Sequence, residues 1–150
     1  MRITTGFLSL AMLYGLSVSS YSQIQNPQVS PRVVAQISRT GQTASIPQRT
    51  LFVPEKDGLF RLSVYLVQTI ATDNSTTNFL VSYTDDTGPE FQQFQSPPTV
   101  GCVRLGAPCS WTILLRANAG TPITWETDIC QGCAPTYEIF ATLEKLQPLQ

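Results

Sequence analysis

The sequence predicts an all-β protein: a single-domain β-sandwich of seven to eight strands, jelly-roll-like in its organisation. Two observations carry this prediction. Apolar and polar residues alternate with a period of two in several short segments, and clusters of Gly, Pro, Asn and Asp separate those segments. No window of the sequence has a sustained apolar period of 3.6 residues, which would indicate a helix. Short strands spaced by turns are typical of sandwiches and jelly rolls.

The N-terminal segment has the features of a secretory signal peptide. A positively charged start at Met1-Arg2 precedes an apolar run at 7–18, and small residues then lead to a cleavage site before Gln23. The run is shorter than the roughly 20 residues that a membrane-spanning helix needs. We therefore expect a cleaved signal peptide at 1–22 and a secreted protein, extracellular or, in a bacterium, periplasmic.

The remainder of the chain is predicted to be one domain. Residues 23–32 are polar and contain two prolines, so we expect an extended arm or linker there. The β-sandwich domain is predicted over 33–147, where neither an internal repeat nor a shift in composition marks a second domain. A chain of this size buries roughly two-thirds of its unfolded surface, which is enough for a sizeable core.

The central strand is expected from Phe60 to Ile70, after a Pro- and Gly-containing turn at 54–58. Its inward side is predicted to carry an apolar row, interrupted by Gln68, that consists of Phe60, Leu62, Val64, Leu66 and Ile70. Before it, a short strand is predicted at 33–38, a turn at 39–42, and an extended run at 43–53 that Pro47 breaks.

The later strands follow the same alternation. Extended segments are predicted at 79–84, 90–94, 100–104, 110–117, 123–129 and 137–144. Trp111 and Trp125 fall on inward rows, where aromatic side chains belong to the core far more often than to a ligand platform. Tyr65 and Phe140 fall on outward rows, so they are the candidate contact surface.

Composition excludes several classes of function. Charged residues make up 13% of the chain, with Lys+Arg 9 against Asp+Glu 10, so there is no concentrated basic face for a nucleic acid. No second apolar stretch is long enough to span a membrane. The chain has no histidine, the commonest general base and metal ligand. We expect a non-enzyme without a cofactor or metal.

The cysteines form two pairs in the sequence. In an exported chain an even number of cysteines indicates disulfides, and four cysteines allow three pairings. We favour local pairing, Cys102 with Cys109 and Cys130 with Cys133, because each pair brackets its own turn.

Two other roles for the cysteines stay open. The Cys130-Gln131-Gly132-Cys133 motif could be a redox dithiol, although the helix that usually activates such a motif is not predicted after it. All four cysteines could hold zinc, although the spacing of Cys102 and Cys109 is wider than in zinc knuckles.

Carboxylates gather in the two loops that flank the strand at 79–84. Asp73 precedes this strand, and Asp85, Asp86 and Glu90 follow it. Oxygen ligands in loops can hold Ca²⁺, so these residues are the candidate ligand or calcium site. The simpler alternative is turn chemistry, in which the Asp side chains cap the backbone.

Two weaker candidates complete the search. Glu126 and Glu138, on strands that could be adjacent, could form the carboxylate pair of a glycosidase. The simpler interpretation places both on solvent-facing rows. Asn74-Ser75-Thr76 fits an N-glycosylation acceptor in a eukaryotic source.

Residues Leu51–Leu66 (LFVPEKDGLFRLSVYL) resemble the strand entry of complement globular-head and tumour-necrosis-factor-like jelly rolls. Phe52, Gly58 and Phe60 match the spacing, and Pro54 stands one residue early. The chain also resembles uncharacterised exported bacterial and phage-associated β-domains, through Gly58–Tyr65 and the hairpin signal TDDTG at 84–88. The resemblance implies a jelly roll used for binding or assembly without catalysis. It also makes a homotrimer a candidate, although Thr136–Leu146 lacks the glycine-phenylalanine ending of the complement heads.

The leading hypothesis is therefore a secreted, non-catalytic β-sandwich that binds an unknown protein or glycan or assembles with itself. The alternative is a carbohydrate- or calcium-dependent binding domain that uses the loops around Asp73 and Asp85-Asp86. The third is a secreted hydrolase built on carboxylates.

Overall fold

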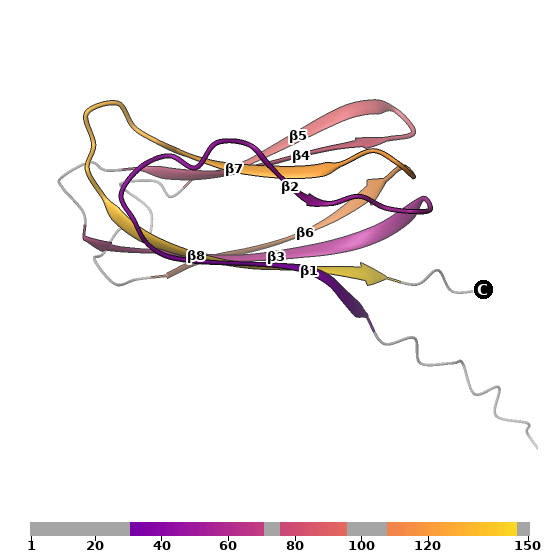
Figure 1. Ribbon diagram of the computed structural model, residues 1–150, viewed down its shortest axis with the longest axis horizontal. Helices are drawn as coiled ribbons and strands as arrows, with labels where there is room; N and C mark the ends of the chain where they lie inside the picture. Colours follow the sequence, from indigo (N-terminus) through magenta and orange to yellow (C-terminus); the bar gives the residue numbers. More distant parts are fainter. Residues whose placement is uncertain (1–30, 71–75, 96–107, 147–150) are drawn as a thin grey trace, which may run out of the picture.

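Eight β-strands make up the described part of the molecule (Figure 1). The computed structural model describes residues 31–70, 76–95 and 108–146, and these ranges contain no helix that could span a membrane. The predicted signal peptide (1–22) and the extended segment at 100–104 lie outside them. The strands are β1 (Arg32–Gln42), β2 (Arg49–Phe52), β3 (Gly58–Ile70), β4 (Thr77–Asp85), β5 (Gly88–Gln95), β6 (Pro108–Ala117), β7 (Ile123–Ile129) and β8 (Thr136–Leu146).

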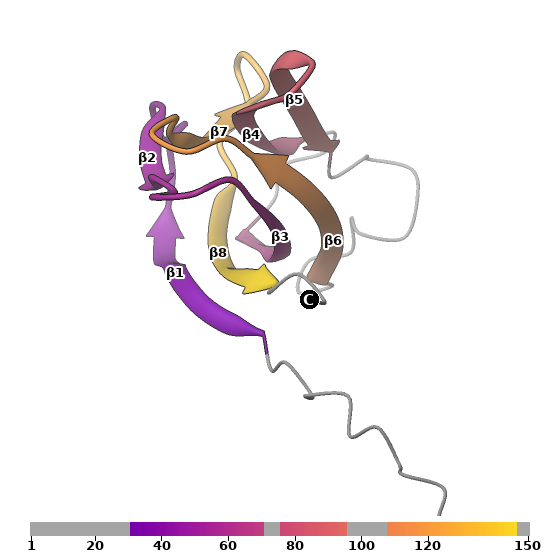
Figure 2. The ribbon, with the colours of Figure 1, turned by 90° about the vertical axis from the view of Figure 1, so that its right-hand side faces the viewer.

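The strands form two four-stranded antiparallel sheets that pack face to face (Figure 2). The first, which we call sheet A, has the order β1-β8-β3-β6, and the second, sheet B, has the order β2-β7-β4-β5. The chain changes sheet at every connection except β4–β5. Strands β1 and β2 lie at the same edge of the sandwich. Eight strands wound in this way form a double-sheet jelly roll, so the predicted fold class is confirmed.

The core lies between the sheets and is built from the predicted inward rows. In β3 the side chains of Phe60, Leu62, Val64 and Leu66 are buried. In the other strands the inward rows include Phe79, Val81, Leu115, Ile123, Trp125, Tyr137, Ile139 and Leu143, which are also buried. At the edge formed by β5 and β6, the rings of Phe94 and Trp111 lie 5.6 Å apart and join the two sheets.

The end of β3 departs from the predicted alternation. Ile70, expected in the inward row, is 59% exposed, because the pairing with β8 shifts register between Gln68 and Ile70. Gln68 is buried, and its amide donates a hydrogen bond of 2.9 Å to the Thr77 hydroxyl. A buried amide needs such a partner, so the polar break in the apolar row is accommodated in the core.

The predicted turn at 39–42 is wrong, because β1 continues through it to Gln42. Gly41 has a φ of 61°, and the pairing of β1 with β8 shifts register between Arg39 and Gln42. A glycine with positive φ at such a shift marks a β-bulge, which bends a strand without ending it. Of the extended run expected at 43–53, only Arg49–Phe52 is a strand.

Candidate functional site

The side of sheet A that faces away from sheet B, hereafter the outer face, carries the predicted contact residues. Tyr65 of β3 lies opposite Phe140 of β8, and their rings are 6.1 Å apart at an angle of 58°. The two residues are 39% and 36% exposed. A tilted arrangement at this distance is a favourable geometry for two aromatic rings.

Cross-strand rows beside this pair are polar, then charged. Ser63 lies opposite both Thr112 and Thr142, with its hydroxyl 3.4 Å from that of Thr112. In the next row the Arg61 guanidinium donates to the Glu144 carboxylate at 2.7 Å. The hydrogen bond and the charge of Glu144 raise the pKa of Arg61 above its usual value. The ions on this face are therefore partly neutralised within the sheet.

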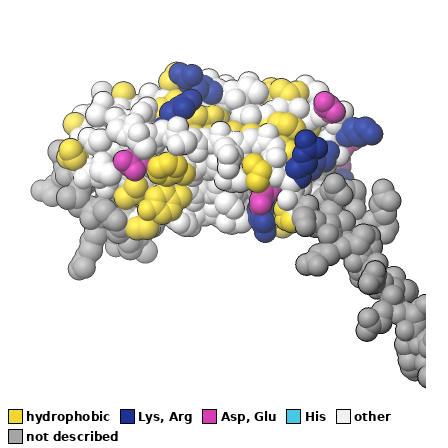
Figure 3. Space-filling model, turned by 60° about the horizontal axis from the view of Figure 1, so that its bottom comes forward, with side chains coloured by type: hydrophobic (Ala, Val, Ile, Leu, Met, Phe, Trp, Pro, Cys, Tyr) yellow, Lys and Arg dark blue, Asp and Glu magenta, His cyan; other side chains and the backbone are white. Residues whose placement is uncertain are grey.

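Further apolar side chains stand exposed on the same face. Leu114 is 61% exposed and lies opposite Arg61, and Leu59 is 40% exposed on the outward row of β3. Figure 3 views this side of the molecule: hydrophobic side chains stand together toward the left, and charged side chains of both signs lie toward the right. The outer face therefore combines an apolar patch with compensated charges.

The carboxylates predicted to bind calcium take part in turn chemistry at the β4–β5 hairpin. The Asp85 carboxylate accepts hydrogen bonds from the backbone N–H and the hydroxyl of Thr87, at 2.8 and 2.7 Å, and the same hydroxyl lies 3.1 Å from Glu90. These bonds to Thr87 lower the pKa of Asp85. Asp86 instead forms an ion pair of 3.3 Å with Arg116.

The predicted calcium site spans two loops, at opposite ends of β4. Strand β4 has nine residues, and at about 3.3 Å per residue its ends lie roughly 27 Å apart. Asp73 and Asn74, in the first of these loops, lie outside the described residues. Within the described ranges no three Asp, Glu or Cys side chains form a group that could hold a metal.

Glu126 and Glu138 do not lie on adjacent strands. Glu126 belongs to β7 in sheet B and Glu138 to β8 in sheet A. Both fall on outward rows, so the whole sandwich separates them. The jelly-roll topology sends these two consecutive strands to opposite sheets, and the two carboxylates cannot act on one glycosidic bond.

The cysteines follow the favoured local pairing where the structure describes them. Cys130 and Cys133 form a disulfide across the loop between β7 and β8. Cys109, at the start of β6, is also disulfide-bonded. Its predicted partner Cys102 lies outside the described residues. The loop disulfide leaves Cys130 and Cys133 without the thiolates that the zinc alternative would need.

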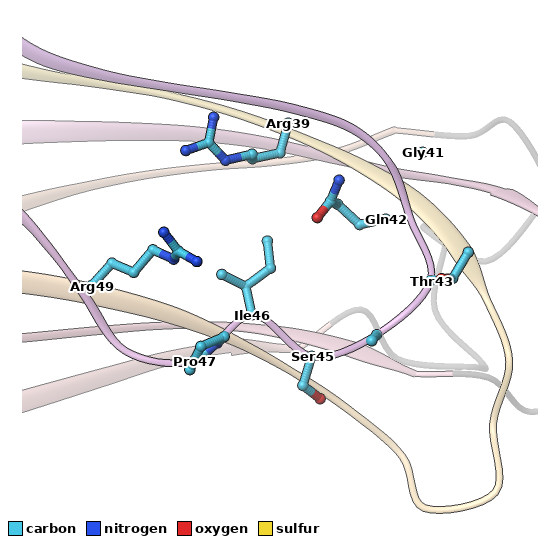
Figure 4. A pocket seen from close by; sticks show the side chains of 9 residues that line it. Arg39, Gly41, Gln42, Thr43, Ser45, Ile46, Pro47 and Arg49 are labelled. Atoms are coloured by element: carbon cyan, nitrogen blue, oxygen red, sulfur yellow. The ribbon is translucent and has the colours of Figure 1, made fainter.

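A cleft between β1 and β2 was not predicted from the sequence. It has a volume of about 490 Å³ and is lined by Arg39, Arg49 and the residues 41–47 that connect the two strands. A neighbouring hollow of about 380 Å³ shares both arginines and adds Gln36 and Thr50. Figure 4 shows the two guanidinium groups extending into the same space, with the Ile46 side chain beside it.

Both arginines occupy inward positions on edge strands. Arg39 lies opposite the buried Ile139, and Arg49 lies opposite the buried Trp125. Side chains opposite core residues project into the space between the sheets. In the sequence, the only signal was that the inward row of β1 continues from Ile37 to a charged residue.

Comparisons with known proteins support the fold. No protein-family model matches the chain, and no curated protein matches it. Among solved structures, the vertex protein P5 of phage PRD1 is similar over 79% of this chain and all of its own, with 13% identity and a TM-score of 0.52. The resemblance to phage-associated domains is therefore confirmed at the level of the fold, which is all that such an identity shows.

Two further solved structures are similar over most of the chain. The alignment with Eiger TNF from S. frugiperda covers 79% of this chain and 96% of the Eiger chain, with 12% identity and a TM-score of 0.44. The CBM22-1 xylan-binding domain of Paenibacillus barcinonensis Xyn10C covers 81% and 84%, with 12% identity and a TM-score of 0.44.

Proposed function

We propose that this protein is a secreted, non-catalytic jelly-roll module that assembles with a second copy of itself through the outer face of sheet A. The observation that carries the proposal is the exposed Tyr65–Phe140 pair near the middle of that face. Within the described residues no element covers it (Figure 2). Contiguous exposed apolar side chains mark interaction surfaces, and tyrosine and phenylalanine are enriched in protein interfaces.

The charge pattern of the face favours a second copy as the partner. Burying an unpaired ion is costly, but Arg61 and Glu144 already neutralise each other within one sheet. The Ser63 row offers hydroxyl groups that both donate and accept hydrogen bonds, so the same row on another copy can bond to it. A two-fold contact requires this kind of self-complementary surface.

The disulfide supports the export part of the proposal. Cys130 and Cys133 form a disulfide. Disulfides persist in oxidising compartments and are rare in cytosolic proteins. Together with the predicted signal peptide at 1–22, it favours a protein that functions outside the cytoplasm.

Light scattering of the purified, oxidised protein tests the proposal. At concentrations up to about 100 µM, which populate a complex of micromolar Kd, we expect a mass above that of the monomer. The double variant Tyr65→Ser/Phe140→Ser should be monomeric at the same concentrations, because it removes the apolar centre of the contact. The matched control is Phe91→Ser, which removes a phenylalanine that is 51% exposed on the outward row of β5 in sheet B.

The outcomes separate the alternatives. A wild-type monomer over the whole range contradicts self-assembly and leaves a different macromolecule as the partner of the face. Equal loss of the oligomer in the double variant and in Phe91→Ser would move the contact away from sheet A. A trimer that the double variant dissociates would support the face while showing that the contact is not a two-fold one.

A further inference from the structure

The arginines of the cleft between β1 and β2 have no carboxylate partner in the described part of the chain. The ion pairs among the described residues join Arg61 to Glu144 and Arg116 to Asp86, and neither includes a cleft arginine. Arg39 donates a hydrogen bond of 3.0 Å to the neighbouring Ser38 carbonyl, which leaves most of its five N–H donors available. Two guanidinium groups that extend into one hollow without a counter-ion form a site for an anionic ligand.

One wall of the cleft is held in place by a chain of three hydrogen bonds, two of them buried. The Ile46 N–H donates to the Thr127 hydroxyl at 2.9 Å, and the Thr127 and Tyr137 hydroxyls are 2.6 Å apart. The Tyr137 hydroxyl in turn donates to the Ala44 carbonyl at 2.8 Å. Thr127 belongs to sheet B and Tyr137 to sheet A, so both sheets fix the segment that connects β1 to β2. A rigid wall lowers the cost of ordering a binding site.

We propose that this cleft binds an anionic polysaccharide, with a carboxylate or sulfate group held between Arg39 and Arg49. The planar guanidinium groups match the geometry of both anions. Uncharged polar side chains also line the two hollows and can bond to sugar hydroxyls; they include Gln36, Gln42, Thr43 and Thr50. The formal net charge of the chain is −1, so a polyanion has to be recognised by this local site.

The lining favours a glycan over an acidic peptide. A peptide that pairs with an edge strand gains affinity from backbone bonds and specificity from pockets for alternate side chains. Two large apolar side chains of this cleft do not provide such pockets, because Ile46 is buried and Trp125 is only 4% exposed. An open hollow with polar walls fits a hydroxyl-rich ligand better.

Inward-pointing charges on edge strands have a second known role, because they prevent sheets from pairing edge to edge. That role requires neither a shared hollow nor two arginines that extend into the same space. This protective role predicts that substitution of Arg39 and Arg49 increases aggregation and leaves glycan binding unchanged. The binding proposal predicts instead that the variant stays soluble and loses glycan binding.

Binding of defined polymers to the full chain tests the proposal. The probes are polygalacturonate, which carries carboxylates, dextran sulfate, which carries sulfates, uncharged dextran and poly-glutamate. We expect the first or second to bind at low salt and dextran not to bind. The double variant Arg39→Gln/Arg49→Gln should weaken this binding by about tenfold or more, since each lost charge-assisted contact is a large share of the affinity.

The matched control has the same change in charge elsewhere on the molecule. Lys56→Gln/Arg116→Gln also removes two positive charges, and neither residue lines the cleft. Its affinity should stay within about threefold of the wild type, the effect expected for general screening alone. The variant Arg39→Lys/Arg49→Lys keeps both charges but loses the planar forks, and its affinity should fall between those of the wild type and the Gln variant. Circular dichroism confirms that each variant is folded.

Three results would overturn the proposal. The first is equal weakening by the two charge-removing double variants, which would make the binding non-specific. The second is the absence of binding to both anionic polysaccharides at low salt. The third is binding to poly-glutamate that matches the polysaccharides and is lost in the same Arg39→Gln/Arg49→Gln variant, which would assign the cleft to acidic peptides.

Discussion

The outer face of sheet A and the cleft between β1 and β2 are built from the same jelly roll but have opposite chemistry. On the outer face, exposed aromatic side chains lie beside an ion pair that is satisfied within the sheet. In the cleft, two arginines share a hollow without a carboxylate partner among the described residues. The first surface can gain free energy by burying apolar area, and the second by pairing charge.

The difference follows from the position of each surface in the fold. Tyr65 and Phe140 lie on β3 and β8, the two central strands of sheet A, where neighbouring strands on both sides hold them. Arg39 and Arg49 lie on β1 and β2, the edge strands, where inward positions open to solvent. An inward arginine in a central strand would be buried without a partner at high cost, whereas at the edge it remains hydrated. The sandwich therefore permits a charged site only at its rim.

Removing the Tyr137 hydroxyl should produce the largest effect that distinguishes the two surfaces. Tyr137→Phe removes the partner of the buried Thr127 hydroxyl as well as the donor to the Ala44 carbonyl, which should lower the free energy of unfolding by about 1–3 kcal/mol. It should also weaken polysaccharide binding, because the cleft wall loses an anchor, while self-association remains unchanged. Urea unfolding and the binding assay measure the two effects.

The control for this substitution is Tyr65→Phe, which removes an exposed hydroxyl from the outer face. We expect it to change stability by less than about 0.5 kcal/mol, as for most surface substitutions. If Tyr137→Phe were as stable as Tyr65→Phe, the hydrogen-bond chain would not anchor the segment. If Tyr137→Phe weakened self-association as strongly as it weakened polysaccharide binding, the two surfaces would not be independent.

Ionic strength should separate the surfaces without any substitution. Between about 0.05 and 0.5 M sodium chloride, binding of polygalacturonate or dextran sulfate should weaken by roughly tenfold or more, because salt screens exposed charges and competes for the arginines. Self-association through apolar contacts should stay the same or strengthen slightly. Titrations and light scattering over the same salt series test this. Association that weakens in parallel with binding would mean that charges also hold the copies together.

The sequence predicted the strands better than the relations between them. Alternation located β7 at its observed bounds, since each inward residue there is apolar or, like Thr127, satisfied by a buried hydrogen bond. The same rule failed at Gly41, because glycine favours both turns and bulges and only the partner strand decides between them. Ile70 was misplaced for the same reason, by a register shift that the pairing with β8 imposes.

Sites that depend on how separate strands come together lay beyond sequence reasoning. Tyr65 and Phe140 could be predicted as outward residues, but their pairing required the register of β3 and β8. The cleft was missed because Arg39 and Arg49 become neighbours only when β1 and β2 meet at one edge. Topology thus creates the proposed glycan site from residues that have no motif in common.

The smallest expected effect is a loss of stability at alkaline pH that reports on the cleft wall alone. Burial raises the pKa of Tyr137 above its ordinary value, while the hydrogen bond from Thr127 opposes that change. Because the folded state then holds the proton more tightly than the unfolded state, this contribution to stability is complete below about pH 10, the pKa of an unfolded tyrosine, and is lost as pH rises through the folded pKa.

Melting temperatures measured upward from about pH 9 should therefore decline more steeply for the wild type than for Tyr137→Phe. Tyr83, whose pKa burial also raises, contributes the same decline to both proteins, so the difference between the two slopes isolates Tyr137. Parallel slopes would mean that the Tyr137 hydroxyl is equally accessible in the folded and unfolded states, and the wall of the cleft would then be mobile where the binding proposal needs it rigid.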